Sequence, residues 1–305
     1  MLESFADYLE YQKRSSKHTV TAYMTDLAQF EEFYEKLCTE DGQKAEEITL
    51  DKVTLQDIRC WVISLVEKKE DGTKLNNKSI NRKLSALKSF YNFLEARNVV
   101  AKNPVNKMKR LKISKTLPLF VVENGMEKLL EDVPYEDGFE GVRDKLIIEL
   151  LYGTGIRLSE ILGLKIKDID LYNQAIKVLG KRNKERIIPM HFALLDLIKN
   201  YLQVKSLVQG VDAENYLITT MSGEQGYPMM IWRIVRKMLD QVSTIERRSP
   251  HVLRHTFATH LLDNGADLNS IKDLLGHSTL ASTQMYTHNS VEKLKKVFEK
   301  AHPKA

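Results

Sequence analysis

The chain has 305 residues with 43% apolar content, two cysteines and a formal net charge of +5. This length and apolar content suffice for a sizeable core and favour two domains. Cys38 and Cys60 are distant from each other and from any metal-ligand spacing, which argues against a disulfide framework and against a zinc module. The sequence shows neither a signal peptide nor a long apolar segment, so we expect a soluble cytoplasmic protein without a membrane partner.

The first hundred residues have helical periodicity. Aromatic and aliphatic residues recur every three or four positions in four successive segments, and Thr49 or Asp51 is the candidate cap of the third. The fourth segment, Leu75 to Leu94, is apolar on one side. Its other side carries the polar or basic residues Ser79, Arg82, Ser85 and Lys88. Side chains of this kind contact DNA backbones, although an ordinary solvated helix face shows the same pattern. We predict a helical, DNA-binding domain over residues 1–103.

A basic connector follows this domain. Asn103 should end the fourth helix, because a residue before proline avoids the helical region. Residues 104–115 contain five Lys or Arg and no Asp or Glu, whereas the rest of the chain is nearly balanced in charge. Such a block fits a strap that lies on a polyanion, and it equally fits a solvated linker. For the strap, the predicted DNA contacts in the linker 104–117 are Lys107, Lys109, Arg110 and Lys112.

A second domain is expected over residues 118–305. It begins with a short helix, Gly125 to Val133, and continues with the nearly all-apolar segment Arg143 to Tyr152, which predicts a central buried helix that ends at the glycines 153 and 155. Arg157 follows directly, and burying its charge without a partner would be costly. Glu160, three residues on, can supply that partner, as can the phosphate of a ligand.

Three alternating segments then predict a small antiparallel sheet. They lie around Ile169 to Leu171, Ile176 to Leu179, and Ile187 to Met190. The turn before the third carries four basic residues: Lys181, Arg182, Lys184 and Arg186. Basic hairpin tips are often exposed for solubility, and a basic tip can also reach into an active site. Helices resume over 193–204 and 231–242, and the second of these carries three further candidate DNA contacts: Arg233, Arg236 and Lys237.

The stretch from Ser249 to His288 organises the second domain. Ser249 can cap a helix whose first position is Pro250. Apolar residues then recur every four positions at 253, 257 and 261, so one stripe of this helix should face a core. A second short helix should end at Gly276, because glycine is the usual left-handed stop of a helix.

Four chemically capable side chains flank these two helices. His251 and Arg254 lie three apart on the first helix, His277 follows the second helix, and Tyr286 comes nine residues later. The planar fork of an arginine matches phosphate oxygens. A histidine near a helix N-terminus is favoured in its neutral form, which a general base needs, and a tyrosine can act as a covalent nucleophile. Each of these residues taken singly is more often structural, so the interpretation needs the charges found upstream.

Five separated motifs therefore stand in order along the chain. They are Arg157 in TGIRLSE, Lys181 in GKRNKER, His251 and Arg254 in HVLRHTFATHLL, His277 in LLGHS, and Tyr286 in QMYTH. Together they resemble the tyrosine recombinases of the phage integrase family, and most closely its Xer-type bacterial members. The likeness covers essentially the whole chain, including the ending EKAHPKA. Mild departures occur at the acidic stretches 39–47 and 68–74.

The resemblance implies a fold that is mainly α with a small antiparallel β-sheet in the catalytic domain. It implies a two-domain, C-shaped DNA clamp, in which a SAM-like helical core-binding domain precedes the tyrosine recombinase catalytic domain. The last helix, residues 291–301, would dock on a neighbouring protomer. Its apolar stripe could instead pack back onto its own domain.

The resemblance also implies a mechanism. Tyr286 would attack a DNA phosphodiester to form a 3′-phosphotyrosyl bond and release a 5′-hydroxyl. His251 would accept the phenolic proton, and Lys181 would protonate the leaving oxygen, a role worth roughly 10²- to 10⁴-fold in rate. One phosphodiester replaces another, so the step needs neither an external energy source nor a metal or other cofactor.

The remaining residues of the set would act on the charge of the phosphate. By the same resemblance, Arg157 and Arg254 would hold its two non-bridging oxygens, where charge grows in the transition state. His277 would donate a hydrogen bond to a phosphoryl oxygen, and Glu160 would orient the first arginine from behind. Four protomers would hold two double-stranded DNA sites, either as a homotetramer or as a heterotetramer with a second recombinase.

Other functions are also open to a chain with these residues. A non-catalytic DNA-binding accessory or regulator of the same fold should lack at least one of the charged catalytic residues, and all are present. A metal-dependent hydrolase is suggested by His251, His255 and His260, but Val252 stands where a zinc helix has its general-base glutamate. Relaxation of DNA by a type IB topoisomerase uses the same chemistry, and the Xer-like ends disfavour it. Chromosome-dimer resolution, mobile-element integration and DNA inversion use the same residues.

Overall fold

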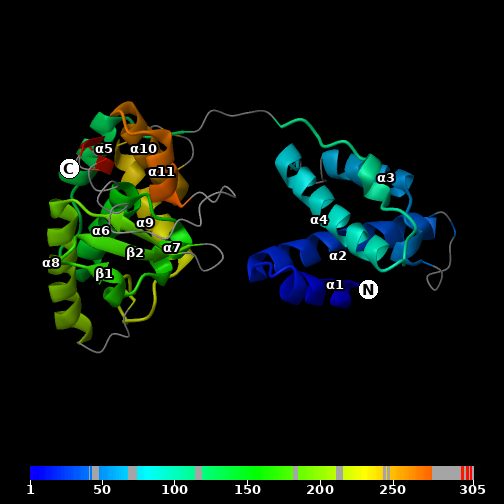
Figure 1. The fold of residues 1–305 in the computed structure, drawn as a ribbon, viewed down its shortest axis with the longest axis horizontal. Coiled ribbons are helices and arrows are strands. Elements are labelled where there is room, and N and C mark those ends of the chain that lie inside the picture. Colours follow the sequence, from blue (N-terminus) through cyan, green and yellow to red (C-terminus); the bar gives the residue numbers. More distant parts are fainter. Residues whose placement is uncertain are drawn as a thin grey trace. The chain divides into compact units, whose positions relative to one another are not determined.

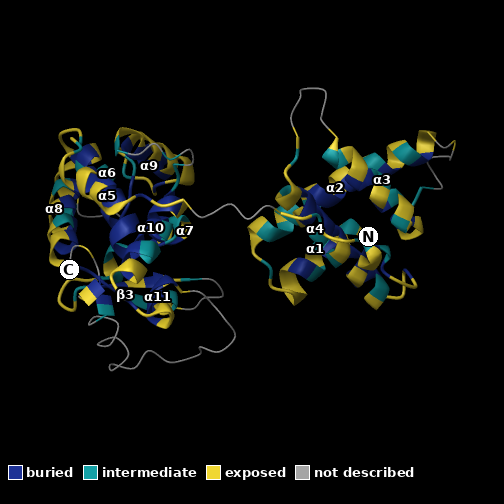
Figure 2. Cartoon of the chain, turned by 90° about the horizontal axis from the view of Figure 1, so that it is seen from above, coloured by how far each residue is buried: buried dark blue, intermediate teal, exposed yellow. Residues whose placement is uncertain are grey.

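The computed structural model divides into two compact units, Met1–Thr116 and Leu117–Ala305. It describes residues 1–40, 42, 48–67, 74–113, 119–180, 185–210, 216–242, 245, 248–276, 297–298, 300–301 and 303. Each unit has its own apolar core, seen as dark blue residues in Figure 2. Among the described helices, none combines the length and the apolar character that crossing a bilayer requires.

Every regular element among the described residues of the N-terminal unit is a helix. Its elements are α1 (Leu2–Asp7), η1 (Tyr8–Gln12), α2 (Lys17–Glu40), η3 (Leu50–Lys52), α3 (Leu55–Val66), α4 (Asn77–Ala96) and η4 (Pro104–Lys107) (Figure 1). The core is aromatic: the ring of Phe30 packs edge-on against Trp61, and Phe5 does the same against Phe90. The four predicted helical segments are therefore confirmed.

The cap of the third helix was predicted wrongly. Thr54 caps α3, because its side chain accepts a hydrogen bond from the backbone N–H of Asp57 while the Asp57 carboxylate accepts one from Thr54 N. Thr49 instead precedes the short turn η3, whose Leu50 carbonyl accepts a hydrogen bond from the Tyr91 hydroxyl. Tertiary packing on α4 thus separates this turn from the helix that follows.

The C-terminal unit combines helices with one small sheet. Its elements are α5 (Glu123–Glu131), α6 (Phe139–Thr154), α7 (Leu158–Gly163), η5 (Ile166–Asp168), β1 (Ile169–Asp170), β2 (Ala175–Leu179), β3 (Glu185–Pro189), α8 (Phe192–Gln209), α9 (Pro228–Val242), α10 (Pro250–Asp263) and α11 (Leu268–Leu275). As predicted, α6 is the central buried helix, and it packs against α8 and α10. The mainly helical fold with a small antiparallel sheet is confirmed.

The sheet has the order β1-β2-β3, and both pairs of neighbours are antiparallel. Ile176 lies opposite Ile188, and Val178 lies opposite Arg186. Arg186 was placed by the sequence at an exposed basic turn, but it is only 4% exposed. This is a correction with a simple reason: residues two apart on a strand face the same side, so Arg186 shares the buried face of Ile188.

The helices α10 and α11 follow the predicted pattern with one exception. Leu253, Phe257 and Leu261 are buried, and α11 ends at Gly276 in the left-handed conformation with φ of 61°. Pro250 occupies the first turn of α10, and Ser249 stands at the cap position. The Ser249 side chain makes no capping hydrogen bond, so its predicted capping role is wrong.

The C-terminal end of the chain packs on its own unit where the structure describes it. Phe298 and Ala301 are buried in the core of the C-terminal unit, and Asn264 Nδ2 donates to the Ala301 carbonyl at 3.1 Å. For these residues, packing back onto the same domain, the alternative to docking on a neighbouring protomer, is the arrangement observed. The other residues of the predicted helix 291–301, apart from Val297 and Lys300, lie outside the described residues.

Gly155 ends the central helix α6 at the point where α6 approaches α10 and α11. α6 runs through Gly153 and ends at Thr154, so only the second of the two glycines acts as a stop. Gly155 has φ of +59°, and a Cβ built on it would lie 2.5 Å from Phe257 Cδ1 and 2.9 Å from Leu275 Cδ2. The close approach of α6 to α10 and α11 therefore requires glycine at this position.

Gly155→Ala should lower the free energy of unfolding of the C-terminal unit by at least about 2 kcal/mol, since it combines a left-handed backbone with overpacking. The measurement is urea unfolding of the full chain followed by Trp232 fluorescence. The background carries Trp61→Phe, which removes the other of the two tryptophans.

Gly163→Ala is the matched control. A Cβ at Gly163 would meet nothing within 4 Å, and its φ is ordinary. The change should therefore stay within about 1 kcal/mol. Equal losses for the two variants would contradict the packing argument.

Candidate active site

Glu160 is the centre of the predicted site. At the start of α7, the Arg157 backbone N–H donates to Glu160 Oε2 at 2.8 Å, and Arg157 Nη1 donates to Glu160 Oε1 at 2.7 Å. The Glu160 side chain is only 4% exposed. The predicted pairing of Arg157 with Glu160 is confirmed, and both the backbone N–H and the guanidinium of Arg157 take part in it.

A second arginine binds the same carboxylate. Arg186 Nη1 and Nη2 each donate to one oxygen of Glu160 at 2.8 Å, which is the bidentate geometry that a guanidinium makes best. Sequence reasoning did not assign this residue to the site. The signal that was available is its position two residues before Ile188 on the same strand, which predicts a shared buried face.

The third arginine approaches from α10. Arg254 is 8% exposed, its Nη1 donates to the Gly155 carbonyl, and its Nη2 donates to the Leu275 carbonyl at 2.6 Å. It therefore joins the end of α6 to the end of α11.

The three arginines bind three consecutive carbonyls at the end of α11. Arg186 Nε donates to Leu274 O at 2.8 Å, Arg254 to Leu275 O, and Arg157 Nη2 to Gly276 O at 3.0 Å. The last carbonyls of a helix have no partner inside the helix and carry the negative end of its dipole. The end of α11 is thus a natural meeting point for cations, and in Figure 1 it lies beside α10.

The charges of this cluster do not balance. Burial alone would raise the pKa of Glu160, but hydrogen bonds and attraction from Arg186 and Arg157 lower that pKa to about 2. Burial, and then repulsion from Arg157 and Arg186, lower the pKa of Arg254 to about 9. Among the described residues of this cluster, three guanidinium groups thus gather around one carboxylate, and this excess of positive charge favours a bound anion such as a phosphate.

His251 lies on α10 one turn before Arg254, in the first turn of the helix, and it is exposed. Of the six predicted catalytic residues, the structure thus places Arg157, Arg254 and His251, with the two arginines meeting at the end of α11. The other three predicted catalytic residues, Lys181, His277 and Tyr286, lie outside the described residues. Two predicted DNA contacts, Arg182 and Lys184, also lie outside them.

His260 has a structural role in this fold. Its Nε2 donates to the Val121 carbonyl at 2.9 Å, and its Nδ1 accepts from the Tyr152 hydroxyl at 3.0 Å. Burial lowers the pKa of His260, in keeping with a neutral ring. Within the described ranges, no group of three His, Cys, Asp or Glu side chains is placed to hold a metal ion.

A buried carboxylate of α2 contacts two basic residues of α4, one of them on the predicted DNA-facing side. Asp26 on α2 is 1% exposed and accepts from Arg82 Nη1 and from Lys83 Nζ, the latter at 2.9 Å. Arg82 keeps 48% of its side chain exposed, whereas Lys83 is buried. One carboxylate thus positions two cations. Of the other predicted contacts on α4, Lys88 is exposed, Ser79 is half-buried, and half-buried Ser85 donates its hydroxyl proton to the Asn81 carbonyl.

The basic connector is fastened to α4. Asn81 Nδ2 donates to the Leu111 carbonyl and Asn81 Oδ1 accepts from Leu111 N, both at 2.9 Å, while Asn77 Nδ2 donates to the Lys112 carbonyl at 2.7 Å. Val105 is buried in the core of the N-terminal unit. The four basic side chains of the predicted strap remain exposed: Lys107, Lys109, Arg110 and Lys112.

The remaining candidate DNA contacts lie on α9. Its apolar face packs into the core, and Arg233, Arg236 and Lys237 are exposed on the other side. Lys237 Nζ contacts Glu136 Oε1 at 2.6 Å, which partly satisfies its charge. Arg233 and Arg236 are accordingly the stronger candidates for DNA contacts on this helix.

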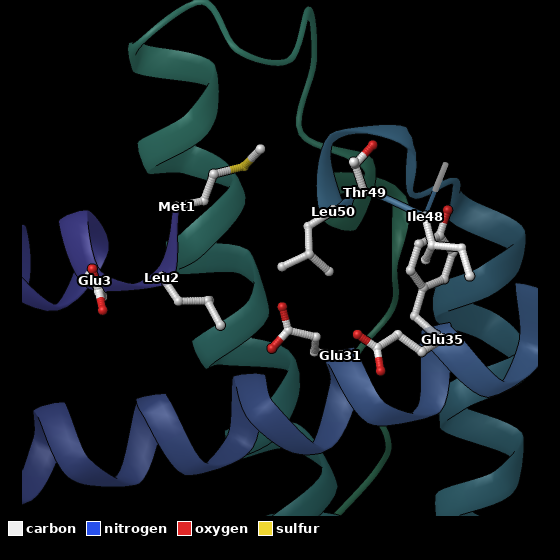
Figure 3. A pocket seen from close by; sticks show the side chains of 9 residues that line it. Met1, Leu2, Glu3, Glu31, Glu35, Ile48, Thr49 and Leu50 are labelled. Atoms are coloured by element: carbon white, nitrogen blue, oxygen red, sulfur yellow. The ribbon is translucent and has the colours of Figure 1, made fainter. Parts of the chain in front are cut away.

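A pocket on the N-terminal unit does not fit a phosphate. It has a volume of about 360 Å³, and its lining includes the carboxylates of Glu3, Glu31 and Glu35 beside the apolar side chains of Met1 and Leu50 (Figure 3). Like charges repel, so a DNA backbone is disfavoured there. Of the two places, the arginine cluster at the end of α11 is the better candidate for an anion site.

Two family models match the chain. The model described as the phage integrase family matches residues 120–293, and the model described as the phage integrase, N-terminal SAM-like domain matches residues 2–98. The chain is 36% identical to the tyrosine recombinase XerC of Chlorobaculum tepidum, with 100% of this chain and 94% of the relative covered. It is 38% identical to the tyrosine recombinase XerC of Listeria innocua, with 99% and 97% covered.

Solved structures show the same fold. The XerH site-specific recombinase bound to its difH substrate in a pre-cleavage complex matches with a TM-score of 0.68 and 23% identity, over 97% of this chain and 82% of that one. The Tn1549 transposon integrase in complex with circular intermediate DNA matches with a TM-score of 0.66 and 22% identity, over 96% and 98%.

Glu160→Gln should destabilise the C-terminal unit in a pH-dependent manner. A carboxylate whose pKa is lowered on folding contributes stability above its unfolded pKa of 4.5, and this contribution is lost as the pH falls toward about 2. The full contribution is about 3 kcal/mol. In urea unfolding followed by Trp232, the advantage of the parent chain over the variant should therefore shrink below pH 4.5.

Glu185→Gln is the control for this prediction. Glu185 forms an exposed ion pair with Lys177, at 2.9 Å between Lys177 Nζ and Glu185 Oε2. A pair of this kind contributes less than about 1 kcal/mol. A Glu160→Gln difference that stays constant from pH 7 to pH 3 would contradict the assignment of the lowered pKa.

Proposed function

The chain belongs to the phage integrase family, and from this premise we propose that it is a site-specific DNA recombinase that cuts and rejoins DNA through a 3′-phosphotyrosyl intermediate. The observation that carries the proposal is the convergence of Arg157 and Arg254, far apart in sequence, at the end of α11 with positive charge in excess. A phosphodiester is an anion that such a cluster fits. The full-length similarity to tyrosine recombinases supports the same conclusion.

The proposed chemistry is an in-line transfer of a phosphoryl group. The Tyr286 oxygen bonds to the scissile phosphorus, and its proton passes to His251. The bond from phosphorus to the 5′-oxygen breaks, and Lys181 gives that oxygen its proton. Because a phosphodiester is exchanged for a phosphodiester, the 5′-hydroxyl of another strand can reverse the step without an energy source.

The charge that grows on the phosphate is stabilised by fixed donors. We assign the non-bridging oxygens to Arg157 and Arg254, with a further hydrogen bond from His277. Glu160 holds Arg157 through its backbone and its side chain, so the guanidinium does not need to be ordered when DNA binds. Each guanidinium has five N–H donors, so donors that are not used by Glu160, Gly155 or the α11 carbonyls are left for the phosphate oxygens.

DNA binding is assigned to both units. We propose that residues 1–103 act as the core-binding domain, that 104–117 act as a basic strap, and that 118–305 act as the catalytic domain of a clamp around double-stranded DNA. The exposed side chains along the fastened connector support the strap, because its backbone is already ordered on α4. Four protomers, of this chain alone or with a second recombinase, then hold two sites. Resolution of dimers and movement of a mobile element are both compatible with this activity.

Tyr286→Phe should retain DNA binding and lose the covalent adduct on a nicked suicide substrate, because the ring remains and only the nucleophilic oxygen is removed. The adduct is measured as a protein–DNA band that resists denaturing electrophoresis. The control is Tyr172→Phe, at a side chain that is 93% exposed, which should form the adduct normally.

Two outcomes would count against this assignment. An adduct in Tyr286→Phe would mean that another residue is the nucleophile. Sequence-specific binding without any adduct in the parent chain would favour a DNA-binding accessory.

Lys109→Gln combined with Arg110→Gln should weaken DNA binding and reduce the slope of log affinity against log salt by about 2 in magnitude, since two phosphate contacts and their released counterions are lost. The control changes the same charge at exposed residues elsewhere, Lys128→Gln with Lys199→Gln. Fluorescence anisotropy at several salt concentrations measures both. Equal slopes in the two double variants would contradict the strap.

A further inference from the structure

We propose that Arg186 is a positioning residue for strand cleavage, one that fixes the relative placement of Arg157 and Arg254 by tying Glu160 to the end of α11. This inference rests on the proposed function. It concerns a residue outside the set of six catalytic side chains, and it is carried by contacts that the structure gives to the Arg186 side chain.

Arg186 uses three donors in two directions. Its Nη1 and Nη2 bind the two oxygens of Glu160, and its Nε binds the Leu274 carbonyl, all at 2.8 Å. Glu160 in turn holds Arg157. One side chain on β3 therefore connects the start of α7 to the end of α11.

The end of α11 is also where Arg254 is held. Arg254 binds the Leu275 carbonyl, one residue after the carbonyl bound by Arg186, and Arg157 binds the next carbonyl, Gly276. A Cβ built on Gly276 would lie 3.1 Å from Arg186 Cδ, so the Arg186 side chain also packs against the left-handed turn that closes the helix. A shift of Arg186 would move the acceptors of both other arginines.

A lysine cannot make this connection. Its ammonium group is a compact point charge, whereas the planar guanidinium makes a two-point contact with a carboxylate and still has Nε available for a third acceptor. Arg186 and Glu160 are each only 4% exposed as side chains, so donors or acceptors lost from this pair are not replaced by bulk water. The geometry of the site therefore depends on arginine, and positive charge alone is insufficient.

Arg143 provides a matched comparison. It is a buried arginine of the same unit, 5% exposed, and its Nη2 pairs with Asp144 at 2.8 Å and Glu140 at 3.1 Å. All three of these residues lie on α6, whereas the hydrogen bonds of the Arg157 and Arg254 side chains go to Glu160, to the Gly155 carbonyl and to the end of α11. Its replacement tests what the loss of a buried guanidinium fork does to stability alone.

The experiment compares Arg186→Lys with Arg143→Lys in the full chain. The single-turnover rate of adduct formation on a suicide substrate, the DNA affinity and the thermal midpoint are measured for each. We expect Arg186→Lys to slow adduct formation about 100-fold with affinity within about threefold, as a small misplacement of reacting groups does. Arg143→Lys should lower the midpoint but keep the rate within about threefold.

A double-variant cycle separates positioning from general damage. If Arg186 acts through Arg157 and Arg254, adding Arg186→Lys to Arg157→Ala should slow the reaction by a smaller factor than Arg186→Lys does in the parent chain, because one of the two positioned groups is already absent. Glu160→Gln, which keeps the size of the side chain, should reproduce the rate defect of Arg186→Lys. Glu160→Gln also tests the positioning role if Arg186→Lys does not fold.

The outcomes distinguish the two proposals. Absence of an adduct in the parent chain overturns the proposed function on which this inference rests. If the parent chain forms the adduct normally, the recombinase function stands, and three results would then overturn the positioning role. They are an unchanged rate in Arg186→Lys, equal rate losses in Arg186→Lys and Arg143→Lys, and fully multiplicative losses in the cycle.

Discussion

Over the residues that the structure describes, the site depends on one buried carboxylate, that of Glu160. Three guanidinium groups gather where α7, β3, α10 and α11 meet, and without Glu160 their mutual repulsion would oppose that packing. Burying a carboxylate is itself costly, and the cost is offset here because Glu160 receives four hydrogen bonds from Arg157 and Arg186. The carboxylate and the arginines are therefore stable only together.

The end of α11 completes the arrangement. Helix carbonyls that have lost their intrahelical partners are good acceptors, and here three in succession receive one guanidinium each. The peptide backbone thus orders arginines from three separate elements without adding a second formal negative charge. A phosphate that enters such a site meets donors whose orientation is already set, which is the condition for strong electrostatic stabilisation of a transition state.

The N-terminal unit uses the same principle at its proposed DNA face. Asp26 is buried and serves both Arg82 and Lys83, so again a single carboxylate orders more than one cation. Asn81 holds the backbone of the connector through one donated and one accepted hydrogen bond, and the basic side chains of the connector remain exposed. In both units, buried polar groups order cations whose charge exceeds that of the carboxylate, and this suits a protein whose proposed partner is a polyanion.

The amino-acid sequence by itself determined the features that depend on neighbours along the chain. Helical periodicity, the glycine stop at Gly276 and the pairing of Arg157 with Glu160 involve residues at most a few positions apart, and the motifs identify the family. Tertiary structure decided the position of Arg186, which joined a buried carboxylate rather than the exposed basic turn, and the choice of Thr54 over Thr49 as helix cap. These outcomes depend on strand register and on packing between distant elements, because burial of a side chain is a property of the whole core and not of the local pattern.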